Sequence, residues 1–466
     1  MQAERIIGSD DTIAAPATPA GGALGIIRMS GPHAVSICDG VFRGRRPLAE
    51  AAPSTVHYGN IVDGDEVIDD VLVAVFRAPH SYTGEDSVEI SAHGSSYIVG
   101  RILSLLASRG ARPAEAGEFT RRAFMNGRMD LSQAEAVADM IASDSRASHA
   151  IAVTQMRGRY SDRLHALRDE LLHIASLLEL ELDFSEEDVE FADRGELAAL
   201  LHRIRDKVSE LADSFETGNA MKNGVTVAIA GRPNVGKSTL LNRLLGEERA
   251  MVSDIAGTTR DTVEAEITID GLIYRFIDTA GIRRTDDRLE QMGIRRTEQA
   301  LQKARIILWL SDDGVFADEN DLFVSQSTDD RRIYRIITKS DLNAGIADAD
   351  TTAASGAPAS EFAAPIRISA KTGEGMDELL AALRSTVDTD AAYSGNVIVS
   401  TRRHYDALRL ARESLDSALS AMEAQLPPDL LSEDIRQIMY HLGTITGEIT
   451  SDDVLKSIFS NFCIGK

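Results

Sequence analysis

Residues 231–239 read GRPNVGKST and match the phosphate-binding pattern G-x-x-x-x-G-K-[ST]. The apolar run VTVAIA (225–230) precedes this stretch and TLLNRLLG (239–246) follows it, as a strand and a helix would. In such a loop, backbone N–H groups and the helix N-terminus hold phosphate oxygens. We expect Lys237 to contact the β- and γ-phosphates and Ser238 to bind Mg²⁺. The predicted nucleotide contacts here are Gly231, Asn234, Val235, Gly236, Lys237, Ser238 and Thr239.

A second motif, DTAG at residues 278–281, strengthens the nucleotide prediction. Asp278 can reach the metal through its water shell, and the Gly281 N–H can donate to the γ-phosphate. The stretch GTTRD (257–261) lies between the two motifs, where a GTPase has its first switch segment. Alone it is equally compatible with a polar turn, but after a phosphate loop it predicts a switch with Thr259 as second Mg²⁺ ligand. The contacts predicted from DTAG are Asp278, Thr279, Ala280 and Gly281.

TKSD at residues 338–341 selects the base. Asp341 can accept hydrogen bonds from the ring N–H and the exocyclic amine of guanine, which adenine cannot donate in this arrangement. The motif usually begins with asparagine, so Thr338 predicts a weaker affinity with the guanine preference retained. SAK (369–371) ends the run PIRIS and is placed to offer backbone groups to the guanine oxygen. GTP is the predicted nucleotide, with contacts from Thr338, Lys339, Asp341, Ser369, Ala370 and Lys371.

The composition limits the setting of this chemistry. Hydrophobic residues make up 43% of the 466 residues and charged residues 26%, without an apolar run long enough to span a membrane. The formal charge of −24 repels polyanions, so any nucleic-acid contact is expected to be local or to involve a partner. Two cysteines, Cys38 and Cys463, argue against a disulfide scaffold. Without a signal-peptide layout, a cytoplasmic location is expected, with Cys38 as a buried structural residue.

The texture of the sequence changes along the chain. VLVAVFRAP (71–79) and SVEISAHG (87–94) read as strands beside helical stretches, which predicts a mixed α/β domain over residues 1–125. Helical spacing then dominates, and it returns near the end of the chain, so a doubly wound α/β domain is predicted to be inserted into a helical bundle. The predicted boundaries are 126–220 for the first helical part, 221–385 for the inserted domain and 386–466 for the second helical part. The apolar seams are Leu164, Leu167, Leu171, Ile174 and Leu178, and Leu408, Ala411, Leu415, Ala418 and Met422.

Taken together, GRPNVGKS, DIAGTTRD (254–261), DTAGIR (278–283) and the terminal CIGK (463–466) resemble motifs of the bacterial tRNA-modification GTPase family called MnmE or TrmE. ATPAGGALGIIRMSG (17–31), SYTGEDSVE (81–89) and GEFTRRAF (117–124) are also similar to family motifs, so the resemblance covers essentially the whole chain. It implies an N-terminal folate-binding and dimer-forming domain, a helical domain built from both sides of an insertion, and an inserted P-loop GTPase domain.

The resemblance also implies how water attacks GTP, because Ile282 stands where Ras-like enzymes carry a glutamine. In the family, K⁺ replaces an arginine finger when two GTPase domains meet, and a glutamate, here Glu290, orients the water. Arg283 and Arg284 are the alternative within this chain, ranked lower because adjacent arginines are usually solvated. The implied K⁺ ligands are Asn234, Ser253, Ile255 and Thr258, within a nucleotide-contacting segment Ser253, Asp254, Ile255, Ala256, Gly257, Thr258 and Thr259.

A second site is implied by the resemblance at the ends of the chain. The family places Cys463 near the one-carbon unit of 5-formyl- or methylene-tetrahydrofolate and Lys466 against the ligand. A prenylation box is excluded, because Gly465 and Lys466 follow Ile464. Arg28 and Glu89 resemble family folate contacts. Arg128 stands where relatives often carry lysine, which keeps the charge but changes the donor geometry.

The resemblance implies that the protein is a K⁺-stimulated GTPase that installs an aminomethyl-type group, such as carboxymethylaminomethyl, on the wobble uridine of tRNA. The resemblance also implies a homodimer that forms a heterotetramer or larger complex with a flavin-dependent partner of the MnmG type. The sequence has no G-x-G-x-x-G loop, so the partner would supply redox chemistry. One alternative is a regulatory or ribosome-assembly GTPase switch. Another is a membrane-tethered GTPase, which the missing lipidation box and the acidic net charge disfavour.

Overall fold

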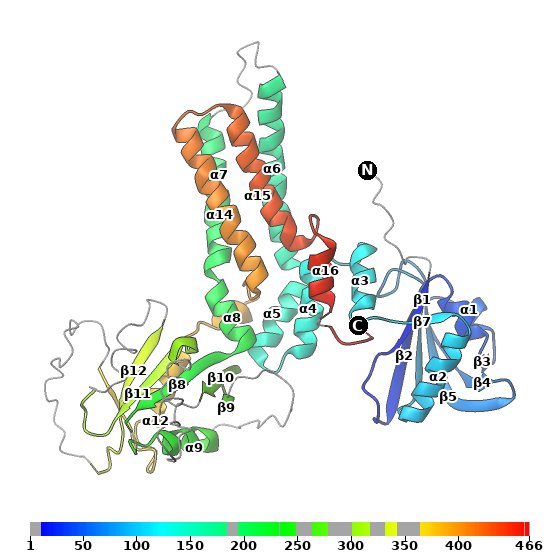
Figure 1. The fold of residues 1–466 in the computed structure, drawn as a ribbon, viewed down its shortest axis with the longest axis horizontal. Coiled ribbons are helices and arrows are strands. Elements are labelled where there is room, and N and C mark those ends of the chain that lie inside the picture. The colour runs from blue at the N-terminus through cyan, green and yellow to red at the C-terminus, as the bar shows by residue number, and fades with distance from the viewer. Residues whose placement is uncertain are drawn as a thin grey trace, which may run out of the picture. The chain divides into compact units, whose positions relative to one another are not determined.

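The structure is a computed structural model that describes residues 11–183, 194–232, 234–247, 263–277, 301–316, 331–342, 364–460 and 462–465 (Figure 1). The chain forms two compact units. The first comprises Met1–Ala138, Gln155–Leu197 and Ser417–Lys466, and the second comprises Asp139–Thr154 and Ala198–Asp416.

The first unit contains a seven-stranded sheet with the order β3-β4-β5-β6-β2-β1-β7. In β5 (Glu66–Phe76), Val71, Val73 and Val75 are buried at every second position, as expected for a strand with one face on a core. Neighbouring strands are antiparallel except β1 and β7. The other strands are β1 (Thr12–Pro16), β2 (Leu24–Ser30), β3 (Phe42–Gly44), β4 (Thr55–Asp63), β6 (Ser87–His93) and β7 (Ala111–Pro113).

Helices α1 (Ala34–Asp39) and α2 (Ser96–Ser108) contribute to the core on one face of this sheet, beside the short 3₁₀ helix at Leu48–Glu50. On the opposite face, Leu24, Tyr58 and Leu72 are 66%, 68% and 49% exposed. Tyr58 and Leu72 are paired across β4 and β5, so these apolar side chains share one open surface. The prediction of a mixed α/β N-terminal domain is confirmed.

The helical part of the first unit has α6 (Arg159–Asp183) and α15 (Pro428–Thr446) side by side (Figure 1). The predicted seam of α6 is confirmed, because Leu164, Leu171 and Leu178 are fully buried. At the surface, Arg436 and Glu179 pair at 3.1 Å. The remaining helices of this part are α3 (Glu118–Met125), α4 (Leu131–Ala142, which runs into the second unit) and α16 (Asp452–Phe459).

The second unit contains α8 and most of three helices that cross into the first unit, namely α5 (Arg146–Met156), α7 and α14. Leu408, Ala411 and Leu415 of α14 are fully buried, as predicted for the second seam. Arg205 of α7 pairs with Asp416 of α14 at 2.5 Å. The helices are α7 (Arg194–Asp213), α8 (Phe215–Asn223) and α14 (Arg402–Glu423). Because α8 leads directly into the next sheet and α14 follows it, that sheet is inserted between two helical segments.

The inserted sheet has the order β13-β12-β11-β8-β10-β9 and is parallel except for the β9–β10 hairpin. The predicted doubly wound domain is confirmed, but β9 was not among the predicted strands. The elements are β8 (Val225–Gly231), α9 (Lys237–Glu247), β9 (Val263–Ile269), β10 (Leu272–Ile277), β11 (Ile306–Ser311), β12 (Arg332–Ile337), β13 (Ile366–Arg367), α12 (Met376–Arg384) and α13 (Asp390–Tyr393).

Among the described helices, none has both the length and the apolarity to cross a membrane.

The two neighbouring leucines Leu171 and Leu172 test the packing of α6, because the first is fully buried and the second is 57% exposed. Leu171→Ala should lower the free energy of unfolding by about 2–5 kcal/mol through lost burial and a residual cavity. Leu172→Ala, the matched control, should change it by about 0.5 kcal/mol or less. Urea unfolding followed by circular dichroism measures both, and equal losses would contradict the assigned face of α6.

Candidate functional site

The phosphate-binding loop joins β8 to α9 at the carboxyl edge of the parallel sheet, where α/β folds bind their ligands. Gly231 ends β8 with φ +141°, and a Cβ atom there would lie 2.4 Å from the carbonyl oxygen of Leu310. Only glycine fits this close approach. The Lys237 Nζ donates to the Gly231 carbonyl at 2.6 Å, so the ammonium group lies within the loop, and Asn234 is exposed at φ +62°.

The guanine motif is attached to this loop by Thr338. Its buried hydroxyl donates to the carbonyl oxygen of Val235 at 2.7 Å, and its backbone N–H donates to the Ser311 carbonyl at 2.8 Å. A buried carbonyl needs such a donor. The threonine therefore connects the base-reading and phosphate-binding segments, while the reduced nucleotide affinity expected from the missing amide stays a prediction.

The structure brings TKSD and SAK together. The Ser369 hydroxyl donates to Asp341 Oδ1 at 2.7 Å, and the Ser340 N–H donates to the Ile368 carbonyl at 3.1 Å. Ser369 is fully buried while Asp341 is exposed. One carboxylate oxygen is thus oriented by serine, which leaves acceptor capacity for the two donors of a guanine edge. Ala370 and Lys371 follow directly in the same turn.

Two acids after β11 belong to this site and were missed by the sequence analysis. Asp312 pairs with Lys339 Nζ at 2.7 Å, and Asp313 pairs with Arg232 of the phosphate loop at 3.1 Å. Hydrogen bonds from the Ser311 hydroxyl and the Val315 N–H hold the pKa of Asp313 below its ordinary value. The available signal was their position, since both acids directly follow a buried parallel strand whose carboxyl end lies at the ligand edge.

Many predicted residues lie outside the described residues and stay predictions, as do Ile282, Arg283 and Arg284. Ser238 is described, at the start of α9. Within the described ranges, no group of three or more His, Cys, Asp or Glu side chains could hold a metal ion. The predicted site residues outside the described ranges are Ser253, Asp254, Ile255, Ala256, Gly257, Thr258, Thr259, Asp278, Thr279, Ala280, Gly281, Glu290 and Lys466.

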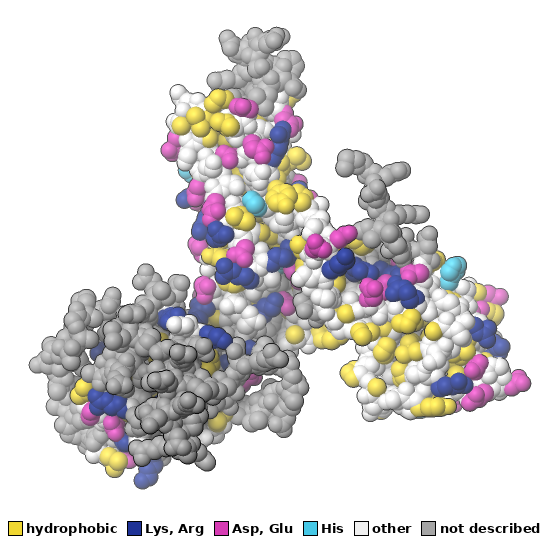
Figure 2. Space-filling view, viewed as in Figure 1, with side chains coloured by type: hydrophobic (Ala, Val, Ile, Leu, Met, Phe, Trp, Pro, Cys, Tyr) yellow, Lys and Arg dark blue, Asp and Glu magenta, His cyan; other side chains and the backbone are white. Residues whose placement is uncertain are grey.

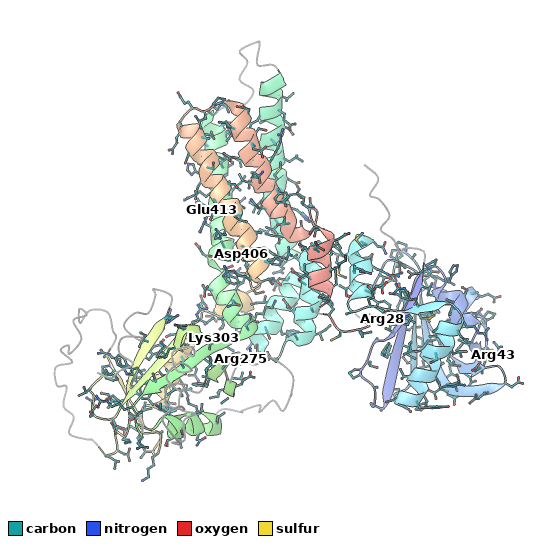
Figure 3. All side chains as sticks on the ribbon, viewed as in Figure 1. Arg28, Arg43, Arg275, Lys303, Asp406 and Glu413 are labelled. Atoms are coloured by element: carbon teal, nitrogen blue, oxygen red, sulfur yellow. The ribbon has the colours of Figure 1, made fainter. Side chains whose placement is uncertain are left out.

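A second cluster is centred on Arg28 of β2 (Figure 3). Its guanidinium group contacts Glu89 of β6 at 2.8 Å and donates to the Gly465 carbonyl at 3.3 Å. Its Cζ atom lies 5.2 Å from the ring centroid of Tyr82 and 5.7 Å from that of Phe119. Aromatic faces attract a cation at this range. Arg28 therefore connects the N-terminal sheet to the C-terminal tail. The side chains of Arg28 and Glu89 are 16% and 29% exposed.

The C-terminal tail docks against the N-terminal sheet region. Ile464 forms a β-bridge with Ala116, and the Gly117 N–H donates to the Cys463 carbonyl at 3.4 Å. Gly465 has φ +95°, and a Cβ atom there would lie 2.1 Å from the Pro16 carbonyl, so the approach requires glycine. Cys463 is exposed beside this cluster, whereas Cys38 is buried as predicted, and burial raises the pKa of its thiol.

Arg128 is exposed, and its side-chain stem lies against the loop before β6. A Cβ atom added to Gly84 would lie 3.2 Å from Arg128 Cγ. The structure therefore brings Arg128 to Gly84, in the loop that precedes the strand carrying Glu89.

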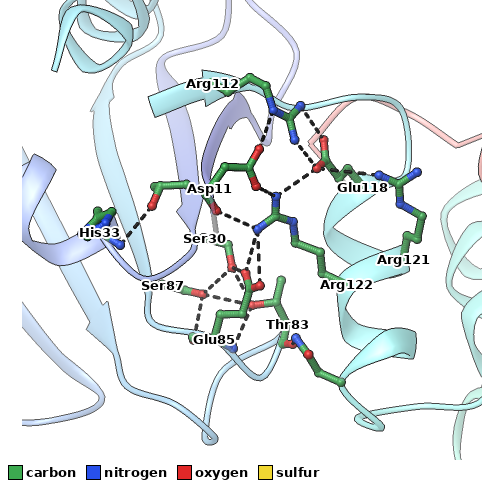
Figure 4. Close-up of polar contacts among 12 residues, drawn as sticks. Asp11, Ser30, His33, Thr83, Glu85, Ser87, Arg112, Glu118, Arg121 and Arg122 are labelled. Atoms are coloured by element: carbon green, nitrogen blue, oxygen red, sulfur yellow. Dashed lines mark hydrogen bonds and ion pairs between the residues drawn. The ribbon is translucent and has the colours of Figure 1, made fainter. Parts of the chain in front are cut away.

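A network of ion pairs joins α3 to Asp11, to Arg112 of β7 and to Glu85 in the loop before β6 (Figure 4). Arg122 contacts Asp11, Glu118 and Glu85 at 2.5, 3.1 and 3.3 Å, and Arg112 contacts Glu118 at 2.6 Å. Burial would raise the pKa of Asp11 and of Glu118, but hydrogen bonds from the arginines outweigh it and hold each pKa below its ordinary value. These carboxylates therefore stay charged and orient α3.

The parallel sheet, phosphate loop and guanine motif define the class of the inserted domain as a P-loop GTPase domain. The family model described as "MnmE helical domain" matches residues 131–463, and "GTP-binding protein TrmE N-terminus" matches residues 12–128.

The "tRNA modification GTPase MnmE" of Cytophaga hutchinsonii is 47% identical over 480 residues, covering 100% of both chains. That of Christiangramia forsetii is 49% identical over 484 residues, covering 98% of this chain and 99% of the relative. That of Flavobacterium johnsoniae is 48% identical over 467 residues, covering 98% and 100%. The chain belongs to the MnmE (TrmE) family of tRNA modification GTPases, as its motifs implied.

Thr338→Val tests the connection between the guanine motif and the phosphate loop. It removes the donor to the buried Val235 carbonyl at nearly constant volume. One neutral hydrogen bond contributes about 0.5–1.5 kcal/mol, so GTP affinity should fall by about two- to twelvefold. Fluorescent-nucleotide titration measures this, and Thr338→Ser should bind like the wild type. An unchanged affinity for the valine variant would remove Thr338 from the site.

Glu118→Gln tests the ion-pair network through its pH dependence. The pKa of Glu118 is lower in the folded than in the unfolded protein, so its ionised form stabilises the fold. This stabilisation is fully present above the pKa of the unfolded state, about 4, and is lost as pH falls through the lower pKa of the folded state. The variant should therefore have a lower Tm than the wild type at pH 7, and the gap should close towards pH 3. Thermal unfolding at both pH values decides this, and a gap independent of pH would contradict the electrostatic role.

Proposed function

We propose that the protein hydrolyses GTP in the cytoplasm and uses the cycle to modify the wobble uridine of tRNA with an aminomethyl-type group. A folate one-carbon unit and a flavin-dependent partner of the MnmG type take part. The observation that carries the proposal is that one chain contains two separate sites. One is the guanine and phosphate site, with the Thr338–Val235 and Ser369–Asp341 hydrogen bonds. The other is the Arg28–Glu89 pair, which contacts the C-terminal tail.

The proposed domains correspond to these separate activities. They are an N-terminal folate-binding and dimer-forming domain at 1–125, helical parts at 126–220 and 386–466, and a GTPase domain at 221–385.

For GTP hydrolysis, the nucleotide is held by the phosphate loop while Asp341 reads guanine. Ser238 and Thr259 would bind Mg²⁺, with Asp278 in the water shell. A K⁺ ion would offset the charge that develops between the β- and γ-phosphates. Asn234 supports this role, because its exposed side chain stands at the rim of the loop and offers a carbonyl oxygen suited to a hard cation.

The other K⁺ ligands would be Ser253, Ile255 and Thr258, in a segment that includes Asp254, Ala256 and Gly257. Glu290 would orient the attacking water, in place of the glutamine that Ile282 replaces. A group that acts in the transition state affects turnover more than binding.

For folate, Arg28 and Glu89 offer a fixed cation and a carboxylate acceptor that remain partly exposed. A carboxylate beside an arginine suits the donor-rich ring of a pterin, in the same way that Asp341 suits guanine. Cys463 is exposed next to this pair and would approach the one-carbon unit, while Arg128 and Lys466 would contact the ligand. The bound folate would supply the carbon.

Two surface features support the proposed partners. The open face of the N-terminal sheet, with Leu24, Tyr58 and Leu72 exposed, is an apolar surface suited to a second copy of the chain. On the helical part, basic and acidic side chains alternate over the visible face (Figure 2). A surface of mixed charge with a net charge of −24 favours tRNA binding through a complex with the flavoprotein over binding by this chain alone.

Potassium dependence tests the GTPase proposal. Wild-type turnover should be faster in K⁺ than in Na⁺, and Asn234→Ala should lose most of that difference because the variant lacks a ligand to the ion. GTP hydrolysis in the two salts measures it. Equal rates for the wild type in both salts would contradict the role of K⁺.

Cys463→Ser tests the tail. GTP hydrolysis should stay near the wild-type rate, because the exposed Cys463 is not part of the buried cluster around the GTPase sheet, whereas the modified wobble nucleoside should disappear. Mass spectrometry of tRNA from cells carrying the variant measures this, with cells lacking the protein as reference. A normal wobble nucleoside in cells lacking the protein would favour a regulatory GTPase. If those cells lack the modified nucleoside but cells with the Cys463→Ser variant contain it at the normal level, Cys463 has no part in the chemistry.

A further inference from the structure

The turn of the β9–β10 hairpin is held by segments outside the nucleotide sheet. Asp270 and Gly271 form the turn at φ +50° and +81°. The Gly271 carbonyl accepts the N–H of Ala147 on α5 at 3.1 Å, and the Asp270 carbonyl accepts the hydroxyl of Tyr393 on α13 at 3.3 Å. Arg384 Nε contacts the Asp270 carboxylate at 2.8 Å.

These contacts are tight. A Cβ atom added to Gly271 would lie 2.9 Å from Arg146 Cβ and 3.1 Å from the Tyr393 hydroxyl oxygen. The Arg146 guanidinium group lies 4.4 Å from the centroid of the Tyr393 ring, so it closes the turn from the α5 side. The Asp270–Arg384 pair is exposed and contributes little, so the fit rests on Gly271, Arg146 and Tyr393.

The same helix shares the core of the hairpin. Ala147 and Ile151 of α5 belong to one buried cluster with Ile269 and Leu272, the residues that flank the turn. Further along β10, Arg275, labelled in Figure 3, has its side chain 3.0 Å from Glu266 of β9. The same side chain lies 3.9 Å from Asp144, just before α5. Close-packed cores transmit displacement because they have little free volume. Helix α5 and the hairpin therefore behave as one packed body.

The hairpin is also the stretch of chain that joins the predicted switch GTTRD to the γ-phosphate motif DTAG. β9 begins at Val263, two residues after GTTRD, and β10 ends at Ile277, directly before Asp278. Its strands are joined by a continuous antiparallel ladder up to the turn, with one register shift at Phe276/Ile277. A change of position at the switch end is thus carried to the turn rather than absorbed by a loop.

We propose that the Asp270–Gly271 turn transmits the nucleotide state of the GTPase domain to helix α5, and through it to the helical domain. The proposal deepens the proposed function, because it gives hydrolysis a physical route to the rest of the chain. Among the described residues, α5 and the α12–α13 region contact the turn, and α5 continues in sequence towards the long helix α6.

The test uses the full-length protein with Gly271→Asn and Tyr393→Ala. Asparagine tolerates positive φ better than other side chains, so the first variant blocks the approach to Arg146 with little backbone strain. The second removes the ring from the other side without changing the hairpin. Gly64→Asn is the matched control, because Gly64 follows Asp63 in another hairpin turn at φ +62° and a Cβ atom there meets nothing within 4 Å.

Hydrogen exchange of α5 amides is compared between GDP and a non-hydrolysable GTP analogue. In the wild type and in Gly64→Asn, exchange of the α5 amides should change by about tenfold between the two nucleotides, and in both test variants the change should vanish. GTP turnover should stay within about twofold of the wild type, because the site itself is intact. The wobble nucleoside should fall in cells carrying either test variant.

An α5 response equal in wild type and variants, or absent in the wild type, would overturn the proposal. Loss of GTP turnover together with the α5 response would also overturn it, since the turn would then serve the site or the fold. A wild-type protein without any role in the wobble nucleoside would end the proposed function, while the exchange experiment would still decide the coupling.

Discussion

The nucleotide domain depends on one close approach, that of Gly231 to the Leu310 carbonyl between neighbouring parallel strands. Without a side chain at this point, β8 can turn out of the sheet and direct the N-terminus of α9 at the phosphate position. The other site segments are attached to this arrangement. Thr338 reaches the loop through Val235, and Asp341 is oriented through Ser369, so base reading and phosphate binding share one framework.

The N-terminal site is organised by charge instead. Arg28 is placed by Glu89, by two aromatic rings and by a carbonyl of the chain terminus, and the adjoining network around Arg122 keeps carboxylates ionised near the surface of the sheet. A buried charge is costly unless it finds partners, which explains why three acids surround the buried Arg122. Such a network also restricts the geometry, because the guanidinium planes fix the direction of each contact.

The insertion of a GTPase domain into a helical protein raises the question of how the two communicate. The contacts of α5 with the β9–β10 turn show that part of the helical family region packs in the core of the nucleotide sheet. Communication then needs no long-range electric field, which dissolved salt would screen. It requires a packed element that carries displacement, and the hairpin is such an element.

The sequence by itself determined what depends on local patterns: the phosphate loop between strand and helix, the apolar seam of α6, and the burial of alternate residues in β5. It also contained the signal for β9, since an Asp-Gly pair at 270–271 between two alternating runs favours a hairpin. Only the tertiary structure decided that Asp312 supports Lys339, that Thr338 reaches Val235 and that Arg28 meets Gly465. These partners are 27, 103 and 437 residues apart, and no local period links them. Their pairing follows from the order in which strands are placed in each sheet and from where the tail docks, which are properties of the folded chain.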